Sequence, residues 1–563
     1  MTITRRGHRQ RPPRQHLPAQ VVLRSDDVRA LEKLAQQAIQ HPSPAQPASL
    51  AQPASLMQRA GLAAAEWARR VLPDSARRVL ILAGPGNNGG DAFEMACHLK
   101  AWHYRVQLVF IGDMASLPTD ARAACERWRQ AGGVCLPAVP SLPAGQGFDA
   151  VVDGLFGLGL GRDLAGEYAE IINKINNLEL FSLALDGPSG LCADRGVVRG
   201  CCLRADHTLS FITLKPGLLT GDGPDYCGQL AVADLGLDVQ GLLQQLRECQ
   251  ITGLDDGWLL DHSALGTLDR WLPPRALNFH KGMAGSVGVL GGAPGMCGAA
   301  LLTGRAALNM GAGKVTLALL DEQAMRVDPL QPELMFASPE QLLASPMTVL
   351  VVGPGLGQSP RATALLRQAM DFPGLLLLDA DALNLIAAVE GEDINPLRAA
   401  LAARRHPTVI TPHPAEAARL MACRTAEIQA DRVRNAQALG HHYHCHVVLK
   451  GNGSVLATPH TMGRAWRINP SGHPGMASAG MGDVLAGLCA GLLAQGLLQA
   501  GLQQPSTENI KRCIASVLDA AVWLHGAAAE RLAASGIGPI GTCAGELIDA
   551  ARALRNQAHS ERD

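Results

Sequence analysis

An aspartate at the end of a glycine-rich run is the feature of this sequence that most directly suggests chemistry. Residues 472–483 read Gly-His-Pro-Gly-Met-Ala-Ser-Ala-Gly-Met-Gly-Asp, and a long apolar stretch of helical length follows Asp483. Backbone N–H groups at a helix N-terminus can hold phosphate, while a neighbouring carboxylate takes a proton from an attacking hydroxyl. Aspartate also serves as a simple helix N-cap. The density of glycine before Asp483 favours phosphoryl transfer over capping alone.

The first half of the chain carries three further segments in which acids and amides stand among glycines. The apolar run from Val79 to Ala83 leads into Gly-Pro-Gly-Asn-Asn-Gly-Gly-Asp at 84–91, which reads as a loop before a helix that begins at Ala92. Asp153 and Asp186 each follow another apolar run and are themselves followed by glycine. A carboxylate in such a place can orient a cation or act as an acid/base group. Each segment alone is a weak signal that an ordinary turn would also explain.

Both sets of motifs follow short apolar runs that alternate with helix-length segments. In the first half these runs are 78–83, 105–111, 149–153, 182–185 and 207–212; in the second they are 287–290, 315–319, 349–352, 375–378, 409–410 and 447–449. This alternation predicts two α/β domains, each with a mainly parallel sheet covered by helices. Ligands bind at the carboxyl ends of the strands in such sheets, which is where the glycine-rich and acidic motifs lie.

The chain is too long for one hydrophobic core, and its two series of runs predict two large domains. We expect a disordered basic tail at 1–25, a first domain at 26–238, a junction at 239–264 and a second domain at 265–563. The hexapeptide Ala-Gln-Pro-Ala-Ser-Leu occurs twice in tandem at 45–56 and is expected to be a loop insertion.

The composition indicates which kinds of partner the protein binds and in which compartment it resides. A formal net charge of -1 provides no global field for nucleic acid or an anionic membrane, so we expect neither as a partner and look instead for small-molecule sites. The 14 cysteines are scattered, which is typical of reduced thiols in a cytoplasmic protein. The apolar stretch from Val484 to Leu498 is shorter than the roughly 20 residues of a membrane span and is expected to be a buried helix.

Two other motifs suggest chemistry but lack the context that it needs. The segment 441–446 reads His-His-Tyr-His-Cys-His, yet no second ligand cluster at zinc spacing accompanies it, so a solvated junction between a helix and a strand is favoured. Gly-Ala-Gly-Lys at 311–314 lacks the first glycine and the Ser/Thr of a P-loop, because Val315 follows the lysine. Neither motif is taken as a site.

Taken in order, the motifs of the first half closely resemble the NAD(P)H-hydrate epimerase domain. The matching segments are Met-Gln-Arg-Ala-Gly at 57–61, Asn-Asn-Gly-Gly-Asp at 87–91, the Asp153 segment, Asp-Gly-Pro-Ser-Gly at 186–190 and Lys-Pro-Gly at 215–217. The resemblance implies a Rossmann-like three-layer sandwich. The sequence departs from the family pattern at Ala92, where glycine is usual, and at Gly187, where an apolar residue is usual.

This first resemblance also implies roles for individual residues. A potassium ion would be held by Asn88, Asp153 and Ser189, and Asp186 would be the acid/base residue near the hydrated carbon. The substrate-binding residues that it implies are Asn87, Asn88, Gly89, Gly90, Asp91, Gly157, Leu158, Gly159, Leu160, Gly161, Arg162, Asp163, Tyr168 and Asp186.

The second half resembles the ADP-dependent NAD(P)H-hydrate dehydratase domain, which has a ribokinase-like three-layer sandwich fold. The resemblance rests on the order of His-Lys-Gly at 280–282, Gly-Pro-Gly-Leu-Gly at 353–357, Asp-Ala-Asp-Ala-Leu-Asn at 379–384, Thr-Pro-His-Pro-Ala-Glu at 411–416, Lys-Gly-Asn-Gly-Ser at 450–454 and the run before Asp483. It implies that ADP, with Mg²⁺, is bound by Lys450, Gly451, Asn452, Gly453, Ser454 and Gly482. The hydrate would face Ala299, Gly357, His413 and Asp483, with Asp483 catalytic.

Together the two resemblances imply a bifunctional repair enzyme for hydrated nicotinamide cofactors. It would epimerise the R and S forms of hydrated NADH and NADPH and dehydrate the S form with ADP, releasing AMP and phosphate. We further expect a homo-oligomer. The alternative is a ribokinase-like kinase for a vitamin or sugar, fused to a non-catalytic Rossmann-like binding domain.

Overall fold

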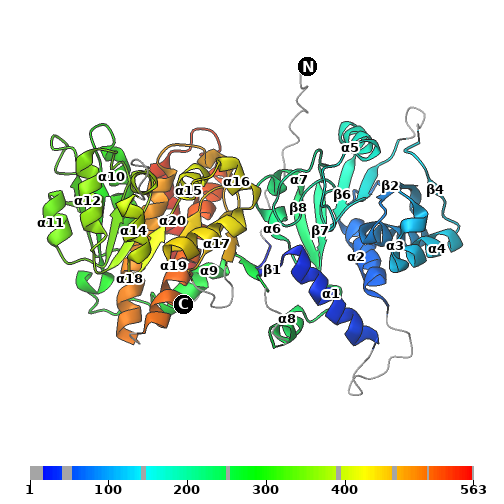
Figure 1. The fold of residues 1–563 in the computed structure, drawn as a ribbon, viewed down its shortest axis with the longest axis horizontal. Helices are drawn as coiled ribbons and strands as arrows, with labels where there is room; N and C mark the ends of the chain where they lie inside the picture. The colour runs from blue at the N-terminus through cyan, green and yellow to red at the C-terminus, as the bar shows by residue number, and fades with distance from the viewer. Residues whose placement is uncertain are drawn as a thin grey trace. The chain divides into compact units, whose positions relative to one another are not determined.

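The computed structural model describes residues 17–40, 54–140, 147–248, 254–388, 395–459, 466–503 and 506–560, and the described chain forms two compact units (Figure 1). The first unit extends to Asp256 and the second begins at Gly257, with Pro18–Gln20 also grouped in the second. This division falls inside the expected junction at 239–264. The junction itself holds the helix α8 (Val239–Glu248) and the strand β9 (Gly257–Leu259).

The first unit is built on a seven-stranded sheet in which all neighbouring strands are parallel. The strand order is β4-β3-β2-β5-β6-β7-β8. The strands are β2 (Arg78–Ala83), β3 (Arg105–Phe110), β4 (Cys135–Leu136), β5 (Ala150–Gly154), β6 (Phe181–Leu185), β7 (His207–Phe211) and β8 (Gln229–Ala233). The order reverses between β2 and β5, and in a doubly wound sheet the ligand crevice lies at such a reversal. The expected Rossmann-like fold is confirmed.

Helices cover both faces of this sheet because its inner strands are apolar on both faces, as the nearly continuous burial of β2 and β5 shows. Leu80 and Leu82 of β2 pack in one cluster with Ile172 of α5 (Glu167–Asn177). Val79 and Ile81 therefore face the other side, where three helices pack together: α2 (Leu56–Val71), α3 (Asn87–Ala101) and α4 (Thr119–Gln130). The other helices of the unit are α1 (Ser25–Gln40), η1 (Met114–Ser116), α6 (Pro216–Leu219) and α7 (Gly223–Tyr226).

The second unit contains an eleven-stranded sheet, ordered β1-β9-β18-β17-β16-β15-β14-β13-β10-β11-β12. Its strands after β9 are β10 (Ser286–Gly291), β11 (Lys314–Leu319), β12 (Met335–Phe336), β13 (Val349–Val352), β14 (Leu375–Leu378), β15 (Thr408–Ile410), β16 (His446–Leu449), β17 (Ser454–Ala457) and β18 (Trp466–Asn469). From β10 to β16 neighbouring strands are parallel, whereas β17 is antiparallel to both of its neighbours. The strand order reverses between β10 and β13, which places a second crevice there.

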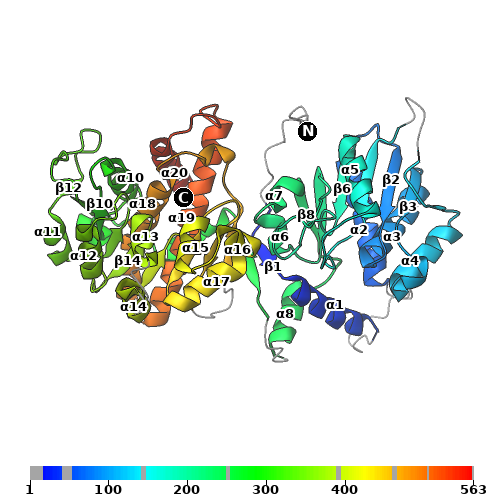
Figure 2. The same cartoon turned by 45° about the horizontal axis from the view of Figure 1, so that its top comes forward.

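One helical layer of the second unit forms its main core. It consists of α10 (Cys297–Asn309), α18 (Met481–Gln503), α19 (Thr507–Ala534) and α20 (Ala544–Ser560), and the last three lie side by side in the two views (Figures 1 and 2). Of the described helices α18 is long and apolar enough to cross a membrane, but 78% of its most apolar window is buried within the protein. The expectation that this segment is a buried core helix is confirmed.

Shorter helices make up the rest of the second unit. They are α9 (Ser263–Thr267), η2 (Leu268–Arg270), η3 (Lys281–Ala284), α11 (Pro339–Ala344), α12 (Pro360–Ala369), α13 (Asp381–Ala387), α14 (Pro396–Ala403), α15 (Pro414–Leu420), α16 (Thr425–Ala430), α17 (Arg432–Tyr443) and η4 (Pro474–Met476). Several of them begin directly after a strand, so their N-termini lie at the edge of the sheet that carries the motifs.

Three local expectations differ from the structure. The tail expected at 1–25 is too long: residues 1–16 lie outside the described chain, but β1 (Gln20–Val22) is a strand and Val22 is fully buried. The tandem hexapeptide lies outside the described residues up to 53, and Ser55 and Leu56 are the N-cap and first residue of α2 rather than loop. The helix expected from Ala92 already begins at Asn87.

The two motifs that were set aside also have clear places. The histidine-rich segment spans the end of α17, with His444 in a left-handed conformation and His446 buried at the start of β16. Within the described chain no group of three or more His, Cys, Asp or Glu side chains could hold a metal ion. Lys314 is the first residue of β11, whereas a P-loop follows the end of a strand.

Candidate active sites

The first candidate site lies where the strand order of the first sheet reverses. The Asn-Asn-Gly-Gly-Asp segment forms the first turn of α3, and its N-cap, Gly86, offers no side-chain hydrogen bond to that turn. The N–H groups there remain available to an anion. Gly89 is required by packing, because a Cβ at this position would overlap the carbonyl oxygen of Gly84. The motif is therefore a close-packed helix start and not a free loop.

Asn88, Asp153 and Ser189 lie at the buried end of this site. Oγ of Ser189 donates to Oδ1 of Asp153 at 2.6 Å, and the main-chain N–H of Ser189 donates to Oδ2 at 2.7 Å. Burial raises the pKa of Asp153 to about 6, although these hydrogen bonds act in the opposite direction. Both polar side-chain atoms of Asn88 are buried without a hydrogen-bond partner.

Such orphaned polar atoms are costly unless something binds them. The three residues offer carboxylate, amide and hydroxyl oxygens, a donor set that suits a hard cation. Asn88 is close to the end of β5, because a Cβ on Gly154 would lie 3.2 Å from the main-chain oxygen of Asn88. The residues present therefore fit a potassium ion.

Asp186 follows β6 and adopts a left-handed backbone conformation, with φ of 60°, that is unusual for a residue with a side chain. Its Oδ1 accepts hydrogen bonds from Nζ of Lys215 and, at 3.2 Å, from the main-chain N–H of Phe211. Its Oδ2 lies beside Gly157, 3.1 Å from the position of a Cβ there, and Cγ of Asn88 is 3.4 Å from the same position. Asp186, Asn88 and Gly157 thus meet at one point.

Two more carboxyl groups face Asp186. Burial raises the pKa of Glu32 on α1, and the negative charge of Asp186 raises it further. Burial also raises the pKa of Asp91 well above its usual value, with further contributions from Asp186 and Glu32. The motifs pointed to Asp91 but not to Glu32, which stands in an amphipathic helix without a signal in its spacing.

The remaining residues expected to bind substrate lie in the loop that begins at Gly157, at the start of α3 and on α5. Gly157, Leu158 and Leu160 are half-buried, and Gly159, Gly161, Arg162 and Asp163 are exposed in the same loop, as is Asn87 on α3. The side chain of Arg29 donates to the carbonyl oxygen of Leu158 at 3.1 Å. The ring of Tyr168 packs edge-on against Phe156, with the ring centroids 4.8 Å apart.

The two departures from the family pattern are accommodated locally. A Cβ on Gly154 would lie 2.5 Å from the side chain of Ala92, so the absence of a side chain at 154 leaves room for the alanine. A Cβ on Gly187 would make an ordinary contact with Leu218 at 3.4 Å. Neither residue distorts the surrounding turns.

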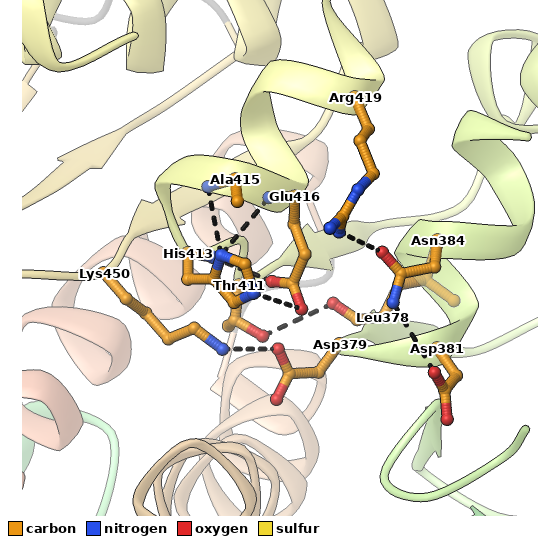
Figure 3. Close-up of polar contacts among 10 residues, drawn as sticks. All are labelled: Leu378, Asp379, Asp381, Asn384, Thr411, His413, Ala415, Glu416, Arg419 and Lys450. Atoms are coloured by element: carbon orange, nitrogen blue, oxygen red, sulfur yellow. Dashed lines mark hydrogen bonds and ion pairs between the residues drawn. The ribbon is translucent and has the colours of Figure 1, made fainter. Parts of the chain in front are cut away.

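The second candidate site gathers acids around the ammonium group of Lys450. Nζ of Lys450 forms an ion pair with Oδ1 of the buried Asp379 at 2.7 Å (Figure 3). A Cβ on Gly482 would lie 3.1 Å from this Nζ and 3.6 Å from Oδ2 of Asp379. The glycine thus lets the start of α18 approach the ion pair. Asp483 is the third residue of α18, inside the helix and not at its N-cap.

The carboxyl group of Asp483 is half-buried among these charges. Burial raises its pKa to about 6; Asp379 and Asp381 raise it further, and Lys450 opposes them. A carboxyl group with a pKa near neutrality is suited to exchange protons at physiological pH. Ala380, between the two aspartates, has φ of 49°, so this strand end also carries backbone strain.

His413 and Glu416 form a capping box at the start of α15, beside the same cluster (Figure 3). The main-chain N–H groups of Ala415 and Glu416 donate to Nδ1 of His413, at 3.0 and 3.3 Å. Nε2 of His413 therefore carries the proton and faces Oε1 of Glu416 at 3.2 Å. Burial raises the pKa of Glu416 to about 7, with Lys450 opposing.

Ala299 and Gly357 lie near the reversal of the strand order. The main-chain N–H of Gly357 donates to Oδ2 of Asp381 at 2.9 Å, which links this glycine to the acids. A Cβ on Gly355 would lie 3.2 Å from the side chain of Ala299 on α10, so Ala299 packs beside the same glycine-rich turn.

The buried guanidinium of Arg432 stabilises the start of the segment expected to bind nucleotide, Lys450 to Ser454. This group donates to the carbonyl oxygens of Leu449 and Lys450, each at 3.1 Å. The structure therefore brings the segment, Gly482, His413 and Asp483 together. Asp379, Asp381 and Glu416 lie in the quoted motifs, but the sequence predicted no role for them. The position of Asp379 directly after β14 was the available signal, whereas Glu416 lies inside α15.

Comparison with known proteins gives a consistent result for both halves. A family model described as NAD(P)H-hydrate dehydratase matches residues 287–550, and one described as YjeF-related protein N-terminus matches residues 53–217. A crystal structure of the ADP/ATP-dependent NAD(P)H-hydrate dehydratase from Bacillus subtilis, co-crystallised with ATP/Mg²⁺, is 25% identical with a TM-score of 0.43. The match covers 53% of this chain and 98% of that one.

Full-length relatives match across both units. The bifunctional NAD(P)H-hydrate repair enzyme of Escherichia coli K12 is 38% identical over 505 residues, which cover 88% of each chain. The enzyme of the same name from Leishmania braziliensis is 37% identical over 499 residues, which cover 84% of each chain. Identity at this level over both units shows that the chain belongs to the family of bifunctional NAD(P)H-hydrate repair enzymes, with an epimerase unit followed by a dehydratase unit.

Proposed function

We propose that Asp186 and Asp483 are the catalytic residues of the two activities. The first unit would interconvert the R and S epimers of hydrated NADH and NADPH. The second would use ADP to dehydrate the S form, releasing AMP and phosphate. The observation that carries this proposal is that each unit has one strand-end or helix-start carboxyl group near the reversal of its strand order and close to a lysine ammonium group: Lys215 pairs with Asp186, and Lys450, which pairs with Asp379, acts on the charge of Asp483.

In the epimerase site the proposed chemistry is reversible transfer of the hydroxyl proton on the hydrated ring carbon. One positioned carboxylate can accept that proton and return it. The first turn of α3, Asn87 to Asp91, would hold a phosphate or ribose group, with the loop from Gly157 to Asp163 and Tyr168 around the ring. Potassium would be held by Asn88, Asp153 and Ser189, whose oxygens it would organise; the unpartnered side chain of Asn88 supports this assignment.

In the dehydratase site Lys450 to Ser454 and Gly482 would hold ADP, while Ala299, Gly357, His413 and Asp483 face the hydrate. Asp483 would take the proton of the ring hydroxyl as that oxygen receives phosphate, and phosphate then leaves to restore the ring. Mg²⁺ would enter with ADP, held by the phosphate oxygens and waters, and would neutralise phosphate charge.

Three further statements belong to this proposal. A cytoplasmic location is supported by the described cysteines, all of which are free. Nucleic acid and membranes are not expected as partners, because the net charge is -1. A homo-oligomer stays a prediction, which light scattering of the purified protein would test.

Separate incubation of the pure R and S epimers with the Asp186→Asn variant and ADP tests the epimerase assignment. We expect S to be dehydrated normally and R to persist, because the two sites lie in different units. Undiminished conversion of R to S would remove Asp186 from the mechanism. Accumulation of a phosphorylated product by the unaltered protein would instead favour a small-molecule kinase fused to a binding domain.

A further inference from the structure

Lys215 is a fully buried ammonium group in the first site to which neither the motifs nor the proposed chemistry gives a role. It lies between β7 and α6. Its Nζ donates to Oδ1 of Asp186, to Oγ of Ser210 at 3.1 Å and to the main-chain oxygen of Phe211 at 2.9 Å. An ammonium group has three N–H donors. All of them are therefore committed within the protein, and none remains for a substrate.

These contacts leave the two oxygens of Asp186 in different situations. Oδ1 accepts from Lys215 and from the main-chain N–H of Phe211. Among the described residues none donates a hydrogen bond to Oδ2, which lies beside Gly157 at the start of the loop expected to surround the substrate. The carboxyl group is thus anchored through one oxygen and open through the other.

We infer that Lys215 is the positioning residue of the epimerase site. It fixes Oδ1 so that Oδ2 points towards the substrate. Oδ2 accepts the proton of the substrate hydroxyl as the bond between that carbon and the ring nitrogen breaks, which leaves a carbonyl group and an electron pair on the nitrogen. The nitrogen then attacks the opposite face of the carbonyl group, and Oδ2 returns the proton to the oxygen. This inference rests on the proposed acid/base role of Asp186.

Two further carboxyl groups lie near enough for the charge of Asp186 to act on them. That charge contributes to the raised pKa of Glu32 on α1 and of Asp91 on α3, and the charge of Lys215 opposes it in both cases. Lys215 is the cation in direct contact with Asp186.

The experiment compares the full-length Lys215→Met and Lys215→Gln variants with Asp186→Asn. Methionine has a similar length but no donor or charge, whereas glutamine retains a donor without the charge. Thr208→Val is the matched control, because Thr208 is fully buried on β7, the strand that precedes Lys215, and its Oγ1 donates to the carbonyl oxygen of Cys227. Conversion of R to S is followed by chromatography. Thermal unfolding shows whether the first unit is folded, and dehydration of S shows that the second unit is intact.

We expect Lys215→Met to lower kcat for epimerisation by about 100-fold, a typical cost of a misplaced catalytic group, with little change in KM. Lys215→Gln, which retains a donor, should recover part of kcat, again with little change in KM. Thr208→Val should have the kcat and KM of the unaltered protein.

An unchanged kcat for epimerisation in Lys215→Met, together with an inactive Asp186→Asn variant, would overturn the positioning role and leave the proposed function standing. An active Asp186→Asn variant would instead overturn the proposed function itself. If Lys215→Met does not accumulate in folded form, Lys215→Gln decides: an unaltered kcat contradicts the inference, and a lowered kcat with an unaltered KM supports it.

Discussion

In each site a lysine ammonium group forms an ion pair with one carboxylate. In the first site Lys215 pairs directly with Asp186, the proposed base. In the second, Lys450 pairs with Asp379 and leaves the neighbouring Asp483 among like charges. The two proposed bases therefore have different surroundings: Asp186 is in direct contact with a buried cation, whereas burial and repulsion raise the pKa of Asp483.

The raised pKa of Asp483 gives the Asp483→Asn variant a distinctive phenotype. The folded state binds a proton at Asp483 with a pKa of about 6, against 3.8 for an ordinary aspartate, so ionisation of this group destabilises the fold above that pH range. Replacement by asparagine should therefore leave Tm at pH 7.5 unchanged or higher, while dehydration falls by about 100- to 10,000-fold through loss of the base.

A simple helix-capping role predicts the reverse result for the same variant, with Tm lowered and activity retained. Thermal unfolding and turnover of S with ADP distinguish the two, and binding of ADP measured by calorimetry should survive. Conversion of R to S by the same sample shows that the first unit is folded. Near-normal dehydration would leave Asp483 without a catalytic role.

The pH dependence of dehydration follows from the same carboxyl groups. The base must be ionised to accept a proton, so the rate should fall as pH drops through the pKa of Asp483, about 6, with Glu416 titrating nearby at about 7. We expect the acidic limb between pH 6 and 7, well above the value of 3.8 for an ordinary aspartate. Initial rates at saturating ADP from pH 5 to 8 check this; a limb near pH 4 would contradict it.

The sequence predicted site residues that lie in unusual local motifs, and it missed residues that reach the site only through contacts between distant parts of the chain. Asp186 and Asp483 are recognisable because glycines surround them. Glu32 lies on a helix remote in sequence, and its proximity to Asp186 depends on how α1 packs. Asp379 was visible as a strand-end acid, but its pairing with Lys450 joins residues 71 positions apart. Chain folding, not local pattern, creates these contacts.

Among the elements, α3 shows how packing overrides local preference. Its first turn, Asn-Asn-Gly-Gly, has poor helix propensity, which is why the helix was expected only from Ala92. The structure begins the helix at Asn87 because Gly89 packs against Gly84 with no space for a side chain. The same contact brings the first-turn N–H groups to the reversal point of the sheet.

A pair of glycine substitutions tests this account of α3. Gly89→Ala places a Cβ on the carbonyl oxygen of Gly84 and should destabilise the first unit by about 1–3 kcal/mol, the usual cost of overpacking. Epimerisation should fall with it. Gly86→Ala is the control, since no atom lies within 4 Å of its Cβ position. Equal effects of the two substitutions on denaturant unfolding would contradict the packing argument.

Buried, purely apolar strands were predicted more accurately than short or mixed strands. Val349–Val352 and Leu375–Leu378 match the expected runs because these strands are buried on both faces and consist of valine and leucine. β4 (Cys135–Leu136) and β12 (Met335–Phe336) were not expected, since each has two residues. β17 and β18 were missed because they mix apolar residues with Ser454, Arg467 and Asn469.

At the scale of the whole molecule, each unit has its own hydrophobic core and its own site. The core of the first unit joins β2 and β5 to α5, and that of the second joins the inner strands to α10, α18, α19 and α20. The contacts described for each site join residues of one unit. The product of the first activity, the S epimer, is a small molecule that can dissociate. The two activities should therefore not need to reside on one chain.

Mixing two singly inactivated chains tests this independence. With Asp186→Asn alone, the R epimer should disappear only as fast as it converts without a catalyst. Asp483→Asn alone should produce S without restoring the dihydronicotinamide absorbance. An equimolar mixture with ADP should consume R completely, because S released by one chain is dehydrated by the other. Varying the concentration of each variant separately shows which activity limits the rate. Failure of the mixture, with both variants individually active on their own substrates, would mean that the S epimer is passed between sites of one chain without release.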